Sequence, residues 1–272
     1  MRATIGTILL AITTSSGIAA QERHEPPNWE VSLGTGVLVS PSYPGAEEYR
    51  ITPFPLTQVS YRGRVYLGPN STGTGLGLGA YAIRTERFRV AAEVGFLDSR
   101  PASRADALAG MRNRDFVPTA TMSMSYRLSA FQGVLSVTQG LNNGAGLLGA
   151  AGLSYSRQVG SRVGATVGVG ATFANARQMR WDFGVSAAEA ARRQALIAAG
   201  DDRLEADEGD PYRPKAGLRQ VGTSLSLMYA VSSHWAVLGF GGLDWLSDQA
   251  VASPLVRRRE QVSGGIGLGY RF

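Results

Sequence analysis

Apolar and polar residues alternate with a period of two along most of this chain. In the segment 161–173, valine, alanine and phenylalanine take every second position, with mostly glycine and threonine between them. The segments 87–97 and 119–128 repeat the pattern. Because successive side chains of a β-strand point to opposite faces, each segment predicts a strand with one apolar face and one small or polar face.

The same alternation predicts about twelve strands. Connections after the odd-numbered strands are long, whereas those after the even-numbered strands are tight turns. This asymmetry is typical of outer-membrane β-barrels, whose long loops face outward and whose short turns face the periplasm. An even strand number then predicts that both termini are periplasmic. The predicted ranges are 29–39, 50–61, 64–68, 75–82, 87–97, 119–128, 131–140, 147–157, 161–173, 217–231, 234–247 and 262–272.

The last predicted strand places Leu268, Tyr270 and Phe272 on one face and ends on an aromatic residue. This ending resembles the C-terminal signal recognised by the barrel-assembly machinery, which we predict as a partner. Other aromatic residues lie on the apolar phase near the strand ends, as expected for two membrane interfaces. We therefore predict a closed antiparallel transmembrane β-barrel rather than a soluble β-sandwich. The interface residues are Trp29, Phe88, Tyr126, Phe131, Tyr155, Tyr229, Trp235, Tyr270 and Phe272 at one end, and Phe96, Phe173 and Trp245 at the other.

Composition narrows the classes of function. Beyond the N-terminus there is no run of 18 apolar residues, which excludes a membrane-spanning helix. Cysteine is absent and the two histidines, His24 and His234, are far apart, so we predict no cofactor, no metal site and no enzyme. The net charge of +6 comes from scattered arginines. We predict no nucleic-acid partner, and contacts instead with outer-membrane lipid and with the phosphates of lipopolysaccharide, through arginines in 98–117 and 257–259.

The first twenty residues read as a signal peptide. Arg2 supplies the positive charge, residues 5–12 form a short apolar stretch, and small residues at 17–20 suit a cleavage site. No cysteine follows that site, so a lipoprotein is not expected. We therefore divide the chain into a signal peptide, 1–20, and an outer-membrane barrel, 21–272.

Charged residues of both signs fall on the phase that faces the barrel interior. They predict either the wall of a charged channel or an internal lattice of salt bridges, and twelve strands allow both. We favour the lattice, because buried charges need partners. The predicted lumen charges are Glu30, Arg87, Arg89, Glu93, Arg127, Arg162, Asp244 and Arg271.

The connection 174–216 is predicted to contain a helix. Ser186 and Glu189 form a capping box, an alanine-rich and arginine-rich stretch follows, and Gly200 is a suitable stop. The acidic run 201–210 lacks the spacing of a calcium loop and is interpreted as a solvated loop. The glycines of 73–79 are spaced by two and open no helix, so they predict a strand rather than a nucleotide-binding loop. His234 is interpreted as a residue of an interfacial turn.

Several local strings resemble the MipA/OmpV family of MltA-interacting outer-membrane proteins. They lie in 41–55, in 182–186 with 212–217, and in 246–256, followed by the terminal Gly-Tyr-Arg-Phe. The sequence departs from the family pattern at Asp182, where tyrosine is usual, and in 191–209, which is longer. The matched positions include Tyr43, Pro44, Gly45, Phe183, Gly184, Val185, Ser186, Ser253 and Pro254.

The resemblance implies a non-enzymatic scaffold of the cell outer membrane that holds a lytic transglycosylase and a penicillin-binding protein together. It carries no catalytic residues. The predicted periplasmic turns are short, so such partners would meet only residues 21–28 and the rim of the barrel. Two alternatives remain open from the sequence: a small-solute channel, and an outer-surface adhesin or lipopolysaccharide-binding protein.

Overall fold

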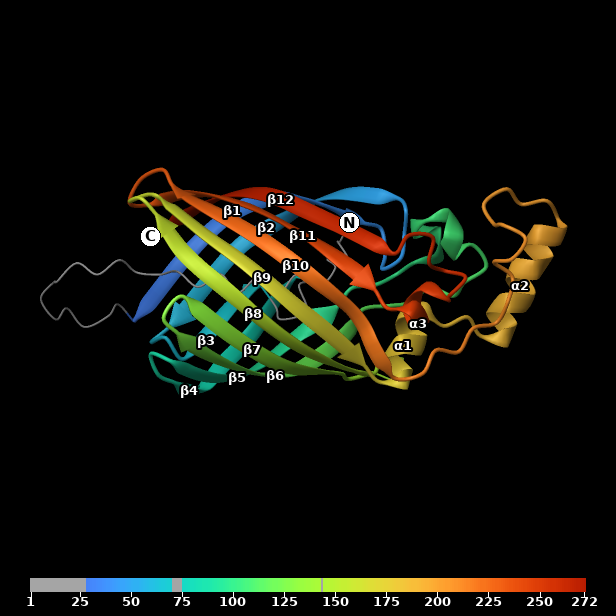
Figure 1. The fold of residues 1–272 in the computed structure, drawn as a ribbon, viewed down its shortest axis with the longest axis horizontal. Coiled ribbons are helices and arrows are strands. Elements are labelled where there is room, and N and C mark those ends of the chain that lie inside the picture. The colour runs from blue at the N-terminus through green and yellow to red at the C-terminus, as the bar shows by residue number, and fades with distance from the viewer. Residues whose placement is uncertain (1–27, 70–74, 143) are drawn as a thin grey trace, which may run out of the picture.

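The computed structural model describes residues 28–69, 75–142 and 144–272, which form one closed barrel of twelve antiparallel strands (Figure 1). Strands pair in sequence order, and β1 pairs with β12 to close the barrel. The predicted fold class is confirmed, whereas the predicted signal peptide lies outside the described residues. The strands are β1 Trp29–Pro41, β2 Tyr49–Tyr61, β3 Val65–Pro69, β4 Leu76–Arg84, β5 Phe88–Leu97, β6 Val117–Leu128, β7 Phe131–Gly140, β8 Leu147–Val159, β9 Val163–Ala174, β10 Gly217–Ala230, β11 Trp235–Leu246 and β12 Glu260–Arg271.

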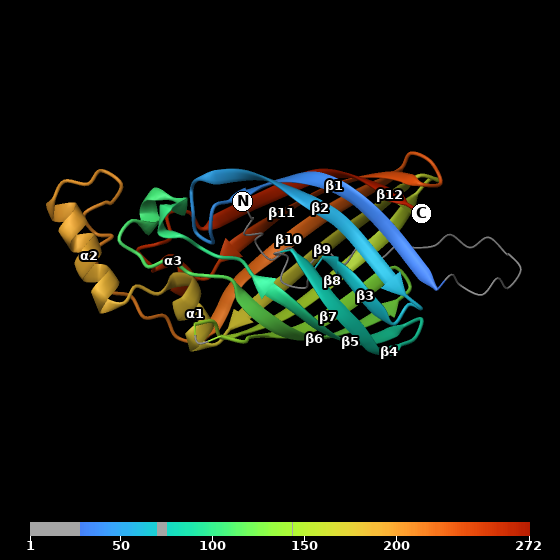
Figure 2. The same cartoon turned by 180° about the vertical axis from the view of Figure 1, so that it is seen from behind.

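Short turns lie at one end of the barrel and long connections at the other. Both views show the helices gathered at the end with the long connections, with the C-terminus at the opposite end (Figures 1 and 2). We call these the cap end and the short-turn end. Among the described residues, no helix is long and apolar enough to cross a membrane.

Three helices lie at the cap end. The predicted helix is α2, Ala187–Ala198, and Ser186 and Glu189 form both hydrogen bonds of its capping box. Two further helices, α1 (Ala176–Phe183) and α3 (Asp248–Val251), were not predicted. Their N-caps, Asn175 and Ser247, are the sequence signals that would have found them.

Aromatic side chains form contacts around the short-turn end. Trp29 lies 4.6 Å from Tyr61 between ring centroids, and Tyr270 lies between Trp235 at 5.0 Å and Phe272 at 4.8 Å. Phe272 is 72% exposed. Because aromatic rings favour the boundary between lipid and water, this ring fits a membrane interface.

The interior of the barrel has two different walls. On one side, Phe54 of β2 and Phe240 of β11 meet edge to face, with centroids 5.9 Å apart. Glycines make room for them, since a Cβ added at Gly36 or Gly265 would lie 2.7 Å from these rings. The opposite wall, on β6 to β10, carries hydroxyl and amide side chains, such as the hydrogen-bonded pair Thr121 and Thr138.

Among the described residues, the pairing between β2 and β3 is the shortest, with three paired positions against five between β3 and β4. β1 pairs with β2 over its whole length, whereas the described part of β3 pairs with β2 from Val59 to Tyr61. Pro53 and Pro55 lie on β2 above this short pairing. Being two residues apart, their nitrogens point the same way, away from the continuous ladder with β1, so the missing N–H groups cost no hydrogen bond to β1. Arg50 and Asp98, 3.3 Å apart, link the ends of β2 and β5 on either side of this seam.

Candidate functional site

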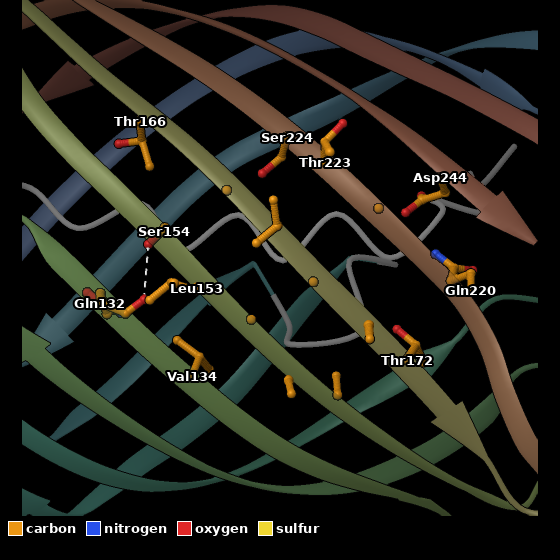
Figure 3. Close-up of a pocket in the computed structure, with 18 of the residues that line it drawn as sticks. Gln132, Val134, Leu153, Ser154, Thr166, Thr172, Gln220, Thr223, Ser224 and Asp244 are labelled. Atoms are coloured by element: carbon orange, nitrogen blue, oxygen red, sulfur yellow. Dashed lines mark hydrogen bonds between the residues drawn. The ribbon is translucent and has the colours of Figure 1, made fainter.

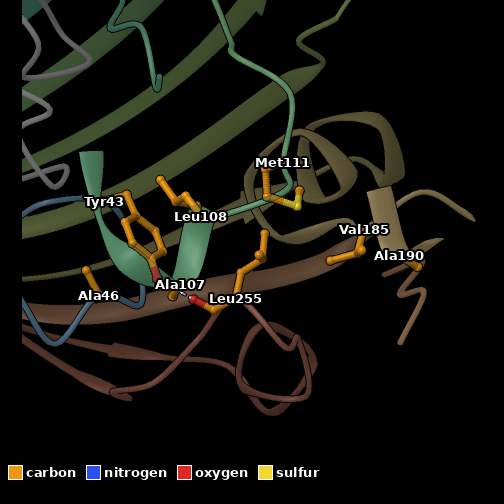
Figure 4. Close-up of a cluster of buried hydrophobic side chains, with 8 residues drawn as sticks. All are labelled: Tyr43, Ala46, Ala107, Leu108, Met111, Val185, Ala190 and Leu255. Carbon is orange, nitrogen blue, oxygen red and sulfur yellow. Dashed lines mark hydrogen bonds between the residues drawn. The ribbon is translucent and has the colours of Figure 1, made fainter. Parts of the chain in front are cut away.

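Four long connections pack together at the cap end into a unit that we call the cap. It comprises residues 42–50, 98–116, 175–219 and 247–260. A buried apolar cluster joins all four connections, as Figure 4 shows. Because its members come from distant parts of the sequence, the cap is a folded structure rather than a set of independent loops. The cluster consists of Tyr43, Ala46, Ala107, Leu108, Met111, Val185, Ala190 and Leu255.

A second buried cluster holds α1 and α3 against the barrel mouth. Met179 and Phe183 of α1 and Ala250 of α3 pack with Ala174 and Leu246, which lie at the cap ends of β9 and β11. Ala174 and Leu246 are on the inward phase of their strands. The two short helices therefore cover inward-facing positions of the barrel wall at its cap end.

The predicted family-motif positions converge in the cap. The Ser253 hydroxyl donates to the Phe183 carbonyl at 2.6 Å, across 70 residues of sequence. The Tyr43 hydroxyl donates to the Leu255 carbonyl at 2.7 Å, and the Gly45 N–H donates to the Gln261 side chain at 2.9 Å. Both bonds are buried and span more than 200 residues. These positions act structurally, by locking connections of distant sequence together.

Arg193 of α2 is the largest fully buried side chain of the cap. Its guanidinium donates to the carbonyls of Ala107, Ala109 and Glu208 at 2.6 to 3.1 Å. It also lies 3.6 Å from the Glu208 carboxylate, which in turn binds Arg257 at 2.8 Å. Glu208 was expected in a solvated acidic loop, but it is buried because these two arginines need a partner inside the cap.

The arginines predicted to face lipopolysaccharide are mostly engaged within the cap. Arg100 and Arg114 are buried, and Arg104 pairs with Asp98 at 3.2 Å. Arg257 binds both Glu208 and Glu47. In this structure Arg112 and Arg258 are exposed, and Arg259, with its side chain 43% exposed, pairs with Asp248.

The predicted lumen charges fall into two groups. Glu93 and Asp244 are buried inside the barrel, and the Tyr66 hydroxyl donates to Glu93 at 3.2 Å. The other six lie toward the short-turn end, where Arg127 donates to Gln132 at 3.0 Å. The interior salt-bridge lattice stays a prediction. These six residues are Glu30, Arg87, Arg89, Arg127, Arg162 and Arg271.

A small cavity lies against the hydroxyl-bearing wall. Its volume is about 70 Å³, enough for a few water molecules. Ser154, Thr166, Ser224 and Gln220 line it, with Asp244 at its edge (Figure 3). A groove of about 540 Å³ lies on the outward apolar face, beside Tyr126, and belongs to the lipid-facing surface predicted for the strands.

The charge of the short-turn end is mostly positive. The described strand ends and turns there contain nine arginines and two glutamates, Glu30 and Glu86. Arg84 and Arg89 are directly opposite each other on β4 and β5. We call this set the basic rim. Its arginines are Arg62, Arg64, Arg84, Arg87, Arg89, Arg127, Arg157, Arg162 and Arg271.

The closed barrel, its apolar outward face and the aromatic side chains near the strand ends together define an outer-membrane β-barrel protein. The chain belongs to the family described as MltA-interacting protein MipA, whose pattern matches residues 33–272. The predicted family resemblance is thereby confirmed. No curated protein sequence matches the chain significantly.

Solved barrels with low sequence identity are similar in architecture. An outer membrane channel from Pseudomonas putida F1 is 11% identical with a TM-score of 0.42, covering 94% of this chain and 100% of that one. An anion-selective porin from Comamonas acidovorans is 11% identical with a TM-score of 0.40, covering 90% and 98%. OmpT of Vibrio cholerae is 9% identical with a TM-score of 0.37, covering 90% and 97%.

Sequence reasoning missed the buried arginines of the cap. Arg100, Arg114 and Arg193 have no distinguishing local pattern, and each acquires its role only when distant connections fold together. Their one available signal is position, since all three lie in the long connections rather than in strands.

Proposed function

We propose that this protein is a non-enzymatic scaffold of the outer membrane that binds peptidoglycan-remodelling enzymes at its short-turn end. The family description names an interaction with MltA, which supports a lytic transglycosylase as one partner. A penicillin-binding protein is the second proposed partner. In this proposal both termini and the basic rim face the periplasm, and the cap faces outward in contact with lipopolysaccharide.

The basic rim is the observation that carries the proposal. The turns at this end have two to four residues, so they form no protruding loop to which a partner could bind. An arginine-rich rim instead offers charge-assisted hydrogen bonds to carboxylates on a flat partner surface. Charge of one sign also speeds the encounter with an acidic partner, an effect that weakens as salt rises.

Binding of a purified lytic transglycosylase to the detergent-solubilised barrel tests this proposal. We expect a neutralised rim to bind at least tenfold more weakly, because four charged contacts are lost. We also expect binding by the unaltered barrel to weaken between low and high salt. The rim variant carries Arg64→Gln, Arg87→Gln, Arg157→Gln and Arg162→Gln, all at exposed positions.

A matched control removes the same charge from the cap. Its binding should equal that of the unaltered barrel, because these side chains lie at the opposite end. Equal loss in both variants, or no binding by the unaltered barrel, contradicts a docking role for the rim. The control carries Arg177→Gln, Arg180→Gln, Arg213→Gln and Arg258→Gln, also at exposed positions.

The proposed orientation has a direct test, because the chain contains no cysteine. A single cysteine at Asp202, in the cap, should react with a membrane-impermeant maleimide added to intact cells. A cysteine at Ser233, in a short turn, should react only after the outer membrane is permeabilised. The reverse pattern would place the basic rim outside the cell and overturn the scaffold proposal.

A small-solute channel is the second candidate, and the hydroxyl-lined cavity favours it. The two helices that cover inward-facing positions at the mouth weigh against a wide pore. Planar-bilayer recordings decide between a channel and a structural barrel. Stable conductance steps from the unaltered barrel support the channel, whereas conductance only after the cap is removed supports a structural barrel.

A further inference from the structure

Two buried arginines lie side by side inside the cap. Arg100 and Arg114 form an isolated antiparallel bridge, with N–H to carbonyl distances of 2.7 and 3.0 Å. Residues directly opposite each other in such a bridge project to the same side. Arg100 is 7% exposed and Arg114 is 4% exposed.

Both guanidinium groups keep N–H groups without a hydrogen-bond partner among the described residues. Arg100 donates through Nη1 to the Asp182 carbonyl at 2.7 Å, but its Nη2 has no acceptor. Arg114 makes one long bond, from Nη2 to the Gly184 carbonyl at 3.5 Å, and its Nε and Nη1 have no acceptor. Buried donors in folded proteins are almost always satisfied, by protein, water or an ion.

The carboxylates nearest to this pair are already engaged. Asp182 accepts from Arg219 at 2.8 Å and from Gln178 at 3.1 Å. Glu189 accepts from the Ser186 hydroxyl at 2.6 Å and from its backbone N–H at 2.9 Å. Each carboxylate also pairs with another arginine, Asp182 with Arg219 and Glu189 with Arg112 at 3.8 Å. Positive charge therefore remains in excess around Arg100 and Arg114.

Aromatic rings cover one face of each guanidinium. Arg114 lies over Trp181 at 5.1 Å, and Arg100 lies over Tyr43 at 5.8 Å from the ring centroid. Stacking of this kind holds a guanidinium plane in place and leaves its N–H edges available. Burial and, after it, the charge of Arg100 lower the pKa of Arg114 well below its ordinary value. The charged form of Arg114 is therefore destabilised, and a bound anion would offset this cost.

We propose that Arg100 and Arg114 form a binding site for an oxyanion of the phosphate class inside the cap. An oxyanion offers several acceptor oxygens, which suits unpaired N–H groups on two separate guanidinium groups. A chloride ion offers one centre and fits this divided donor set less well. The phosphate would tie 98–116 to 182–184, two connections that already meet there. This site does not depend on the proposed scaffold role.

Phosphate binding to the full-length barrel in detergent tests the site. The midpoint of thermal unfolding should rise saturably with inorganic phosphate, at constant ionic strength set with chloride, since a ligand specific to the folded state stabilises it. In Arg114→Gln the apparent phosphate affinity should fall at least tenfold. Arg112→Gln, an exposed arginine two residues away, should retain the response. No shift beyond that given by chloride, together with no response to phosphorylated lipopolysaccharide, overturns the proposal.

Two further arms keep the test decisive. If Arg114→Gln does not fold, Arg100→Lys retains the charge but loses donors, and equilibrium dialysis with labelled phosphate should show weaker binding. Vesicles of lipopolysaccharide with and without lipid A phosphates identify the source of the anion. A response to inorganic phosphate supports a free ion, and a response only to phosphorylated lipopolysaccharide supports the lipid. Equal responses to both vesicle types, with none to phosphate, contradict the site.

Discussion

The two ends of this barrel carry charge in opposite ways. The cap contains sixteen basic and fifteen acidic residues, so its formal charge nearly cancels, whereas the basic rim has nine arginines against two glutamates. Arginines of the cap pair with carboxylates far away in sequence, as Arg257 does with Glu47 and Glu208. Within the rim, Arg84 lies opposite another arginine, Arg89. The cap thus uses its charge to hold itself together, whereas the rim leaves its charge for the surroundings.

Loop length explains much of this difference. A turn of two residues fixes only its own neighbours, so it cannot bring a distant carboxylate to an arginine. Connections as long as 175–216 can fold back, and each buried pair that they form requires the rest of the cap to be in place. Charge in the cap should therefore matter for stability, and charge in the rim should matter for binding. Four predictions test this contrast, beginning with the largest effect.

Replacing Arg193 with alanine should have the largest effect. It leaves the Glu208 carboxylate without one partner and three carbonyls without a donor. Breaking a buried ion pair in this way costs about 3 to 5 kcal/mol. Limited proteolysis should then cleave the cap between α2 and β10 while the barrel stays intact. Arg192→Ala, next to it on the exposed face of α2, loses one bond to Gly110 and should cost at most about 1 kcal/mol.

Tyr43→Phe should have the next largest effect. It removes the buried hydroxyl that donates to Leu255 and leaves that carbonyl unsatisfied, at a cost of about 1 to 3 kcal/mol. The thermal stability of the cap reports the change. Tyr126→Phe is the control, because Tyr126 is 49% exposed on the outward face. Equal effects of the two substitutions would mean that the Tyr43 bond is not a tie of the cap.

Acid should loosen the cap through Glu189. Burial raises the pKa of this carboxyl, but hydrogen bonds from the Ser186 hydroxyl and from the backbone of Ser186 and Arg112 outweigh it, so the pKa lies below 4.5. A folded-state pKa below the unfolded one gives stability that is present above about pH 4.5 and is lost as pH falls through the lower value. Fluorescence of Trp181, with the other tryptophans replaced, should report this loss. Glu189→Gln should flatten the dependence, and an unchanged pH profile would count against the assignment.

Arg162→Gln at the basic rim should have the smallest effect on stability. Arg162 is exposed in a short turn, and exposed substitutions change stability by about 0.5 kcal/mol or less. Thermal unfolding of the barrel measures it. A loss as large as that of Arg193→Ala would abolish the distinction between the two ends.

The sequence predicts the barrel wall well and the cap poorly. Alternation and connection length predict all twelve strands, because each strand pairs with its neighbour in sequence and its pattern is local. The helix α2 is also local, through Ser186 and Glu189. By contrast, the buried roles of Arg100, Arg193 and Glu208 depend on contacts between connections separated by tens of residues. No period or spacing encodes them, so they appear only in the folded structure.

The short pairing between β2 and β3 has a consequence for local opening of the barrel wall. In the described part of the chain it has three paired positions, compared with eight at the closure of β1 with β12. Amide protons near Val59 and Leu67 should therefore exchange with solvent sooner than those of β12, since fewer bonds must break together to expose them. Among the described strand pairings, the one expected to open most easily thus lies within the chain, two strands away from the junction of its ends.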